Sequence, residues 1–303
     1  MNILQGSGTS SDARPESVGG LEQTRQLGPA RPAVEDSRGI LRPHESLRAF
    51  RRSRSAAPKP LAAHLDLFWH VDWDLPGGVV HHQRLLTLPA VHVVIDARDA
   101  TVVGPLRRPW ARDLSGHGWA LGVMYRPGAF RDTLGAPVST ITDRSVPMSE
   151  VFGPNCTRFA AAVRGAATDE ERFALTADFF TNQLTAPSAE QLAATSAMQR
   201  VIDDEAIIRV TDLAQTCHLS IRHLQRLFAD HVGVTPKWAI RRYRLANAAE
   251  RVARRQEVQW QIVAHELGYS DQSHLVRDFT AVIGMSPARY ADACRTPSPE
   301  RSP

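Results

Sequence analysis

The chain has 303 residues, a formal net charge of +4 and 43% hydrophobic residues, so it can hold two ordinary domains with packed cores and additional tails. Its three isolated cysteines, Cys156, Cys217 and Cys294, have no C-x-x-C spacing, so neither a zinc module nor a disulfide framework is indicated. No apolar run approaches the ~20 residues of a membrane span, and the N-terminus lacks an apolar signal core. We therefore expect a cytoplasmic protein.

Residues 1–58 are rich in Gly, Ser, Pro and Arg and poor in aromatic residues. Such a segment cannot bury enough apolar surface to offset its ordering entropy, so we predict a disordered tail. Alternatively, the true translation start lies further along the chain, and part of this segment is not translated. The basic run RAFRRSRS (Arg48–Ser55) could contact DNA non-specifically, although a solvated tail is the more common case.

Short strands separated by turn residues are expected over residues 59–153. Leu65, Leu67 and Trp69 occupy alternate positions there, and a Pro-Gly-Gly turn follows them. Later β-branched runs at 91–95 and 101–103 are separated by polar residues. This pattern predicts a small antiparallel barrel or sandwich, which we interpret as a sensory or dimerisation domain.

A helical connector is expected over residues 154–204. Phe173, Ala177, Phe180 and Leu184 recur there at the spacing of one helical face. That face could serve in dimerisation, but packing against the β-rich domain is the more common arrangement. The three expected helices span 158–164, 169–184 and 189–204.

The stretch Val210–Pro236, VTDLAQTCHLSIRHLQRLFADHVGVTP, predicts two short helices joined by a tight turn. Ser220 is a suitable N-cap because its hydroxyl can accept an unpaired backbone amide. The second helix is therefore expected at 220–231, ended by Gly233, with Pro236 beginning the next helix. This is the pattern of a helix-turn-helix unit.

The same pattern occurs again in Ile262–Tyr290, IVAHELGYSDQSHLVRDFTAVIGMSPARY, with Asp271 as the expected cap and a second helix at 271–283. A shift of 51 residues aligns Leu224, Arg226, Phe228, Gly233 and Pro236 with Leu275, Arg277, Phe279, Gly284 and Pro287. Agreement at five positions supports a true repeat. The expected core of the two units consists of Leu213, Leu224, Phe228, Leu267, Leu275 and Phe279.

Donor-rich side chains lie opposite the apolar face of each expected second helix, where they could bond guanine and adenine edges in a major groove. The candidate base-contacting residues are Arg222, Gln225, Arg226, Gln272, Ser273 and Arg277. Between Ser220 and Gln256 there are nine Lys and Arg against two acidic residues, which suits a phosphate backbone. A plain solvated helix face is the alternative. The candidate phosphate-contacting residues are Ser220, Lys237, Arg241, Arg242 and Arg244.

The pair HLQRLF…GVTP and LGYSDQSHLVRDF…GMSP resembles the DNA-binding domain of the AraC/XylS family of bacterial transcription regulators. The resemblance covers about the last hundred residues and implies an all-α domain over 205–295. The residues after it, 296–303, are expected to form a disordered tail. It also implies a helix from Lys237 to about Arg255 that bridges the two units. Cys217 and His218 stand at the first turn in place of the usual glycine, so we expect a looser turn there.

The order of FWHVDWDLP and YRPGAF resembles the N-terminal domains of some AraC-type regulators, which implies a cupin-like barrel for 59–153. The expected fold class is therefore α+β, with a β-rich first domain and an all-α second domain. The family resemblance implies a sequence-specific regulator, by family habit an activator that contacts RNA polymerase. Its recognition helices would enter two successive major grooves of double-stranded DNA. The sequence leaves open whether the protein binds a small-molecule effector and whether it forms a homodimer.

The same residues also bear on other classes of function. A ligand-independent architectural DNA-binding protein is the main alternative. A DNA-repair methyltransferase would need a cysteine-bound zinc module and a Pro-Cys-His-Arg run, and the sequence has neither. No Ser/His/Asp set, Cys/His set or glycine-rich phosphate loop stands out, so we expect no enzyme activity and no cofactor.

Two groups of side chains in the β-rich region were considered as binding sites. The histidines follow no ligand spacing, so we expect no metal; they are His70, His81, His82 and His92. The aromatic residues could line an apolar ligand pocket, although core packing is more common for them. They are Trp69, Trp73, Trp110, Trp119 and Tyr125.

Overall fold

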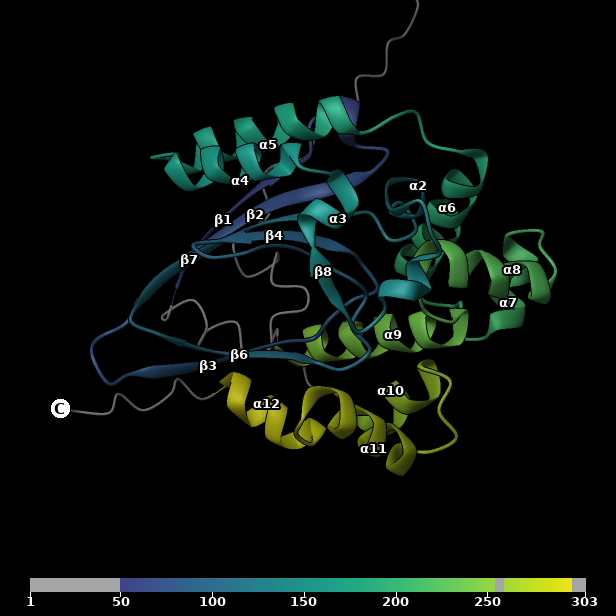
Figure 1. The fold of residues 1–303 in the computed structure, drawn as a ribbon. Helices are drawn as coiled ribbons and strands as arrows, with labels where there is room; N and C mark the ends of the chain where they lie inside the picture. Colours follow the sequence, from purple (N-terminus) through teal and green to yellow (C-terminus); the bar gives the residue numbers. More distant parts are fainter. Residues whose placement is uncertain (1–49, 254–258, 296–303) are drawn as a thin grey trace, which may run out of the picture. The chain divides into compact units, whose positions relative to one another are not determined.

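The computed structural model describes residues 50–253 and 259–295 (Figure 1). Three expectations lie outside these residues: the part of the N-terminal tail up to residue 49, the tail at 296–303, and the end of the bridging helix at Arg254 and Arg255. A β-rich region is followed by a helical one, which confirms the expected fold class. None of the helices described is both long enough and apolar enough to span a membrane.

The β-rich region contains two antiparallel sheets (Figure 1). The larger has the strand order β1-β2-β7-β4-β5-β8, and the smaller pairs β3 with β6. The strands are β1 (Arg51–Ala56), β2 (Leu65–Asp74), β3 (Val80–Leu85), β4 (His92–Asp96), β5 (Ala100–Val103), β6 (Trp110–Ser115), β7 (His117–Tyr125) and β8 (Ser145–Pro147).

Helices α2 to α5 belong to the β-rich half of the chain, and α6 to α12 follow them. They are α2 (Arg131–Leu134), α3 (Met148–Phe152), α4 (Asn155–Gly165), α5 (Asp169–Gln183), α6 (Ala189–Asp203), α7 (Val210–Thr216), α8 (Ile221–Leu227), α9 (Pro236–Ala253), α10 (Trp260–Glu266), α11 (Gln272–Ile283) and α12 (Pro287–Arg295). The described residues also include three short helical turns: η1 (Lys59–Leu61), η2 (Val138–Ile141) and η3 (Phe228–Val232).

Strand β1 corrects the expectation that a disordered tail extends to residue 58. Its residues pair with β2 along their whole length, from Arg51 opposite Asp72 to Ala56 opposite Leu67. An edge strand tolerates charged side chains because one of its sides is not paired with another strand. A polar, Arg-rich composition therefore does not prevent a strand at this position, and most of the basic run Arg48–Ser55 is part of the sheet.

In strand β2, the alternation of Leu65, Leu67 and Trp69 does not mark the side that faces the core. The pairing with β7 shifts register between Leu65 and Leu67, which marks a β-bulge or a similar irregularity. Beyond that point Phe68 and His70 are buried, while Leu67 and Trp69 are half-buried. A one-residue slip moves every following side chain to the other face, so the alternation could not locate the inward side.

Helices α4 and α5 run side by side next to the larger sheet (Figure 1). Phe159 of α4 stacks on Phe179 of α5 with ring centroids 4.1 Å apart, and Phe180 is completely buried. These aromatic residues and the inward side chains of the sheet form one hydrophobic cluster. Of the two options for α5, packing against the β-rich region is the one found. The face noted in the sequence contributes Phe173, Ala177, Phe180 and Leu184 to this cluster.

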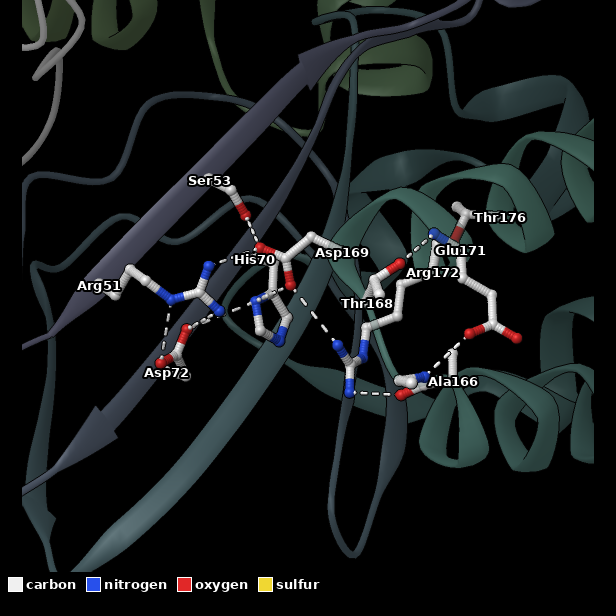
Figure 2. A network of polar contacts seen from close by, with 11 residues as sticks. Arg51, Ser53, His70, Asp72, Ala166, Thr168, Asp169, Glu171, Arg172 and Thr176 are labelled. Carbon is white, nitrogen blue, oxygen red and sulfur yellow. Dashed lines mark hydrogen bonds and ion pairs between the residues drawn. The ribbon is translucent and has the colours of Figure 1, made fainter.

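Polar contacts join the start of α5 to β1 and β2 (Figure 2). The Asp169 carboxylate accepts hydrogen bonds from Ser53 Oγ at 2.5 Å and from Arg51 Nη1 at 3.1 Å, and His70 Nδ1 lies 3.0 Å from it. Burial by itself would raise the pKa of Asp169, but the Ser53 hydrogen bond and the charges of His70 and Arg51 hold it below its usual value. The buried carboxylate is thus satisfied and fixes α5 against the edge of the sheet.

The helical region has two hydrophobic clusters, one for each repeat. Leu213, Leu224 and Phe228 are buried in the first, and Leu275 and Phe279 in the second. Leu267 packs against the second cluster and is partly buried. Helix α6 also contributes to the first cluster, through Ala197, Met198 and Val201.

Candidate nucleic-acid interface

The first repeat is a helix-turn-helix built from α7 and α8. Ser220 Oγ accepts a hydrogen bond from the His223 amide at 3.2 Å, which caps α8 as expected. The helix continues through η3 and ends at Gly233, whose φ of 81° lies in the left-handed region. Helix α9 then begins at Pro236, the residue expected to start it.

The second repeat has the same construction in α10 and α11. Asp271 Oδ1 accepts from the His274 amide at 2.8 Å, and this hydrogen bond lowers the pKa of Asp271. The cap is therefore ionised at neutral pH, which suits the positive end of the helix dipole. Gly284, with φ of 86°, ends α11 as Gly233 ends the first unit.

The first turn is not looser than the second, contrary to our expectation. The amide of His218 donates to the Gln215 carbonyl at 3.1 Å, and the amide of Gly268 donates to the His265 carbonyl at 2.9 Å. His218 has a φ of 54° and occupies the left-handed position that glycine occupies in the second unit. The repeat offset is 50 residues at this point, so a shift of 51 had placed Cys217 opposite the glycine.

Replacing His218 with glycine is expected to raise the free energy of unfolding by about 1 kcal/mol, because a residue with a Cβ is strained in this conformation. The matched variant is Gly268→Ala, which should lower the free energy of unfolding by at least a similar amount. A Cβ at Gly268 would lie 3.3 Å from the Ile208 side chain, and φ is 73°. Urea unfolding of the full chain, followed by circular dichroism, measures both changes. A His218→Gly variant no more stable than the wild type would contradict the strain argument.

The side chains predicted to contact bases are all exposed. Arg222, Gln225 and Arg226 lie on α8, and Gln272, Ser273 and Arg277 lie on α11. Ile221, the first residue of α8, was not among the predicted contacts, yet its exposed fraction is 44%. An apolar side chain at this end of a recognition helix suits a thymine methyl group. The available signal was an apolar residue directly after the cap and outside the buried helical face.

The expected phosphate contacts divide into two groups. Ser220 and Lys237 are exposed, and Arg241 is half exposed but forms an ion pair with Asp278 of α11. Arg242 and Arg244 are 3% and 2% exposed, which corrects their assignment as phosphate contacts.

The two buried arginines use their donors inside the protein. Arg244 Nη2 donates to the carbonyls of Val201 at 2.9 Å and Asp204 at 2.5 Å. Arg242 donates to the Arg107 carbonyl, and its guanidinium lies 4.5 Å from the centroid of the Trp238 ring. Burial lowers the pKa of Arg242 to about 10, so it stays charged at neutral pH. Successive helical residues are rotated by roughly 100°, so Arg242 does not share the exposed side of Arg241, and the burial of Arg244 follows from its contacts with the end of α6.

The histidines of the β-rich region have different surroundings and do not form one site. His82 Nδ1 lies 2.6 Å from Asp113, and His81 Nε2 lies 3.1 Å from Gln83 Oε1. Trp69 Nε1 donates to His92 Nδ1 at 3.4 Å. In the described part of the chain, no three ligating side chains come together in a way that could hold a metal.

The candidate aromatic pocket is likewise divided among several environments. Tyr125 is fully buried in the sheet core, 4.6 Å from the Phe130 ring. The rings of Trp69 and Trp73 cover Gly122 and Gly118 of β7, where a Cβ would collide with them. Trp119 packs near His70 and Arg172, and Trp110 lines an open surface hollow.

Comparison with protein families gives two matches. Residues 213–293 match the family described as "Helix-turn-helix domain", and residues 53–147 match "Domain of unknown function (DUF6597)". Residues 213–293 are an AraC-type helix-turn-helix domain. The second match begins inside β1, in the segment expected to be a tail, and ends with β8.

Two similar curated proteins match over the AraC-type domain. One is "Probable transcriptional regulator LumQ" of Photobacterium leiognathi, 36% identical over 83 residues, which are 27% of this chain and 33% of that protein. The other is "Uncharacterized HTH-type transcriptional regulator YfiF" of Bacillus subtilis (strain 168), 34% identical over 83 residues, 27% of this chain and 26% of that protein. The chain therefore spans about a third or less of each relative.

Solved structures with similarity include the C-terminal domain of AraT, a response regulator from Geobacillus stearothermophilus. It has 20% identity and a TM-score of 0.32, and the match covers 38% of this chain and 95% of that one. Apo ToxT from Vibrio cholerae has 9% identity and a TM-score of 0.39, with coverage of 79% and 100%.

Proposed function

We propose that this chain is a sequence-specific transcription regulator that binds double-stranded DNA through its AraC-type domain, without catalysing a reaction. The observation that supports this most strongly is the repeated geometry of α8 and α11. Each helix is capped by a side-chain oxygen and exposes hydrogen-bond donors, and each unit then ends at a left-handed glycine, Gly233 after η3 and Gly284 after α11. Two such helices suit successive major grooves on one face of a duplex, about one helical turn or 10 bp apart.

We assign separate roles to the exposed side chains of this domain. Arg226 and Arg277 would bond guanine in the two half-sites, and Gln225 and Gln272 would bond adenine. Lys237 is the strongest candidate for a phosphate contact, since it is exposed at the start of α9. The β-rich region would act as a sensory or dimerisation domain. We further propose that the protein activates transcription by contact with RNA polymerase. The β-rich region would bind a small-molecule effector, and the protein would act in the cytoplasm.

The test of this function combines selection and mapping. Full-length protein is expected to enrich one bipartite sequence from a random pool of duplex DNA. Genome-wide mapping of bound DNA should then find that sequence upstream of genes whose transcripts change on deletion. Enrichment of no sequence would contradict specific binding. Bound sites without any transcript change would favour an architectural DNA-binding protein instead.

We also propose that the DNA-binding domain begins before α6 and not at residue 205. Met198 and Val201 of α6 are 1% and 0% exposed and pack in the cluster of Leu213 and Phe228. Full burial of such side chains stabilises a fold by about 1.5–3 kcal/mol each. Residues 205–303 alone would therefore lose part of the core of the first unit.

A fragment of residues 186–303 is expected to unfold cooperatively and to bind the selected DNA at low salt. A fragment of residues 205–303 should be less stable by about 3–6 kcal/mol, enough to abolish a cooperative transition in so small a domain. Thermal unfolding and gel-shift titration of both fragments measure this. Equal stability of the two fragments would contradict the role of α6. Failure of the longer one to bind, while the full chain binds, would make the β-rich region part of the binding unit.

A further inference from the structure

The β-rich region contacts the equivalent end of both helix-turn-helix units. Gly233, at the end of the first, accepts a hydrogen bond on its carbonyl from Thr142 Oγ1 at 2.6 Å, and a Cβ on it would lie 2.9 Å from Val138 Cγ1. Gly284, at the end of the second, lies beside the guanidinium of Arg84, whose Nη2 would be 2.4 Å from a Cβ built on the glycine. A cation at the C-terminus of α11 is also favoured by the helix dipole.

The segment Arg84–Leu88, which runs from the end of β3 into the connection to β4, also enters the hydrophobic clusters of these units. Leu86 is 3% exposed and belongs to the cluster of the second unit, which contains Leu275 and Phe279. Leu88 packs against the clusters of both units. One short segment of the β-rich region therefore contacts both halves of the AraC-type domain.

The same segment is tied to the connection between β5 and β6. Thr87 Oγ1 donates to the carbonyls of Leu106 at 2.8 Å and Arg108 at 3.0 Å. The carbonyl of Arg107, between them, accepts from Arg242 of the bridging helix α9. The first unit, the second unit and the helix that joins them are thus all attached to neighbouring points of the β-rich region.

We infer that Leu86 and Arg84, with Thr142, are positioning residues that fix the separation and orientation of the two recognition helices. They would thereby set the half-site spacing that the protein accepts, an inference that rests on the proposed function. One inserted base pair moves a half-site by about 3.4 Å and rotates it by about 35°. Two units held by close-packed side chains cannot follow such a change without breaking that packing.

The test uses the full chain and a duplex that the full chain has selected from a random pool. Derivatives of this duplex carry one or two base pairs inserted or removed between the half-sites, and a further duplex carries a single half-site. The wild type is expected to lose about tenfold in affinity or more per inserted base pair, the effect of a mismatched position. In Leu86→Ala and Arg84→Gln that loss should shrink to about threefold or less, with single-half-site affinity within about twofold of the wild type.

Two matched variants provide controls. Leu65→Ala makes the same deletion in the core of the larger sheet, where the leucine is 1% exposed and belongs to neither helix-turn-helix cluster. Arg98→Gln removes the same charge from an exposed position in the turn between β4 and β5. Both should keep the spacing preference of the wild type. Arg84 is exposed, so Arg84→Gln decides the question if Leu86→Ala fails to fold.

The inference is overturned if the wild type tolerates every spacing equally, or if Arg84→Gln and a folded Leu86→Ala keep its spacing preference. It is also overturned if these variants lose single-half-site binding as strongly as binding to the full site, because that indicates general destabilisation. Failure of the proposed function looks different, since the wild type would then enrich no sequence from the pool at all.

Discussion

Binding of the full chain to its selected DNA is expected to weaken steeply as salt rises from 50 to 200 mM. Each phosphate contact contributes about −0.9 to the slope of log affinity against log salt concentration. Lys237→Ala, at the exposed start of α9, should therefore make the slope shallower by about 0.9. Fluorescence anisotropy titrations at several NaCl concentrations give these slopes directly.

Arg242→Gln is the matched control for the salt titration. It removes the same unit of charge from α9, but from a side chain that is 3% exposed and bonded to the Arg107 carbonyl. The slope of this variant is expected to equal that of the wild type, even if the protein is less stable. A flat titration of the wild type would contradict the electrostatic interpretation, and a shallower slope for Arg242→Gln would contradict its structural role.

Replacement of either equivalent arginine, Arg226 or Arg277, by alanine is expected to relax base preference in one half of the site only. A guanidinium bonded to guanine through two hydrogen bonds contributes roughly 1–3 kcal/mol of discrimination, which corresponds to about 5- to 150-fold in affinity. Arg226→Lys retains the charge without the planar pair of donors, so its discrimination should resemble that of Arg226→Ala. Competition binding against duplexes mutated one position at a time measures the effect.

The result that would reject this assignment is an equal loss of affinity for selected and random DNA. Arg226 and Arg277 would then be phosphate contacts, which position a protein on the duplex without specifying its sequence. Because the two residues lie 51 positions apart in equivalent places on α8 and α11, the two variants should affect opposite half-sites. Loss of preference at the same bases in both would also contradict the two-groove arrangement.

The helical repeats could be predicted because their determinants are local. Ser220 and Asp271 cap helices through amides only three residues away, and Gly233 and Gly284 end them through their own backbone conformation. Period and spacing are enough to detect such features. The sequence also indicated a helix at 169–184 for the same reason, since its apolar face recurs along one continuous segment, and α5 spans Asp169–Gln183.

The remaining features depend on partners far away in the chain. Strand β1 is an edge strand that, among the described strands, pairs only with β2, so its own composition gave no signal. Leu86 belongs to none of the patterns noted in the sequence, and only the tertiary fold brings it into the hydrophobic cluster of Leu275. The burial of Arg244 likewise depends on the carbonyls of Val201 and Asp204 at the end of α6. The periodicity of a local segment does not indicate such contacts between distant residues.

The change of offset from 50 residues at the turns to 51 at the helix caps has a consequence for the history of the gene. If both units descend from one ancestral copy, a single codon has been gained or lost between the turn and the cap. The additional residue of the second unit lies near Ser270, beyond the turn's backbone hydrogen bonds and before the Asp271 cap. Selection would tolerate an insertion there, because neither helix changes its length, its cap or the side that it buries.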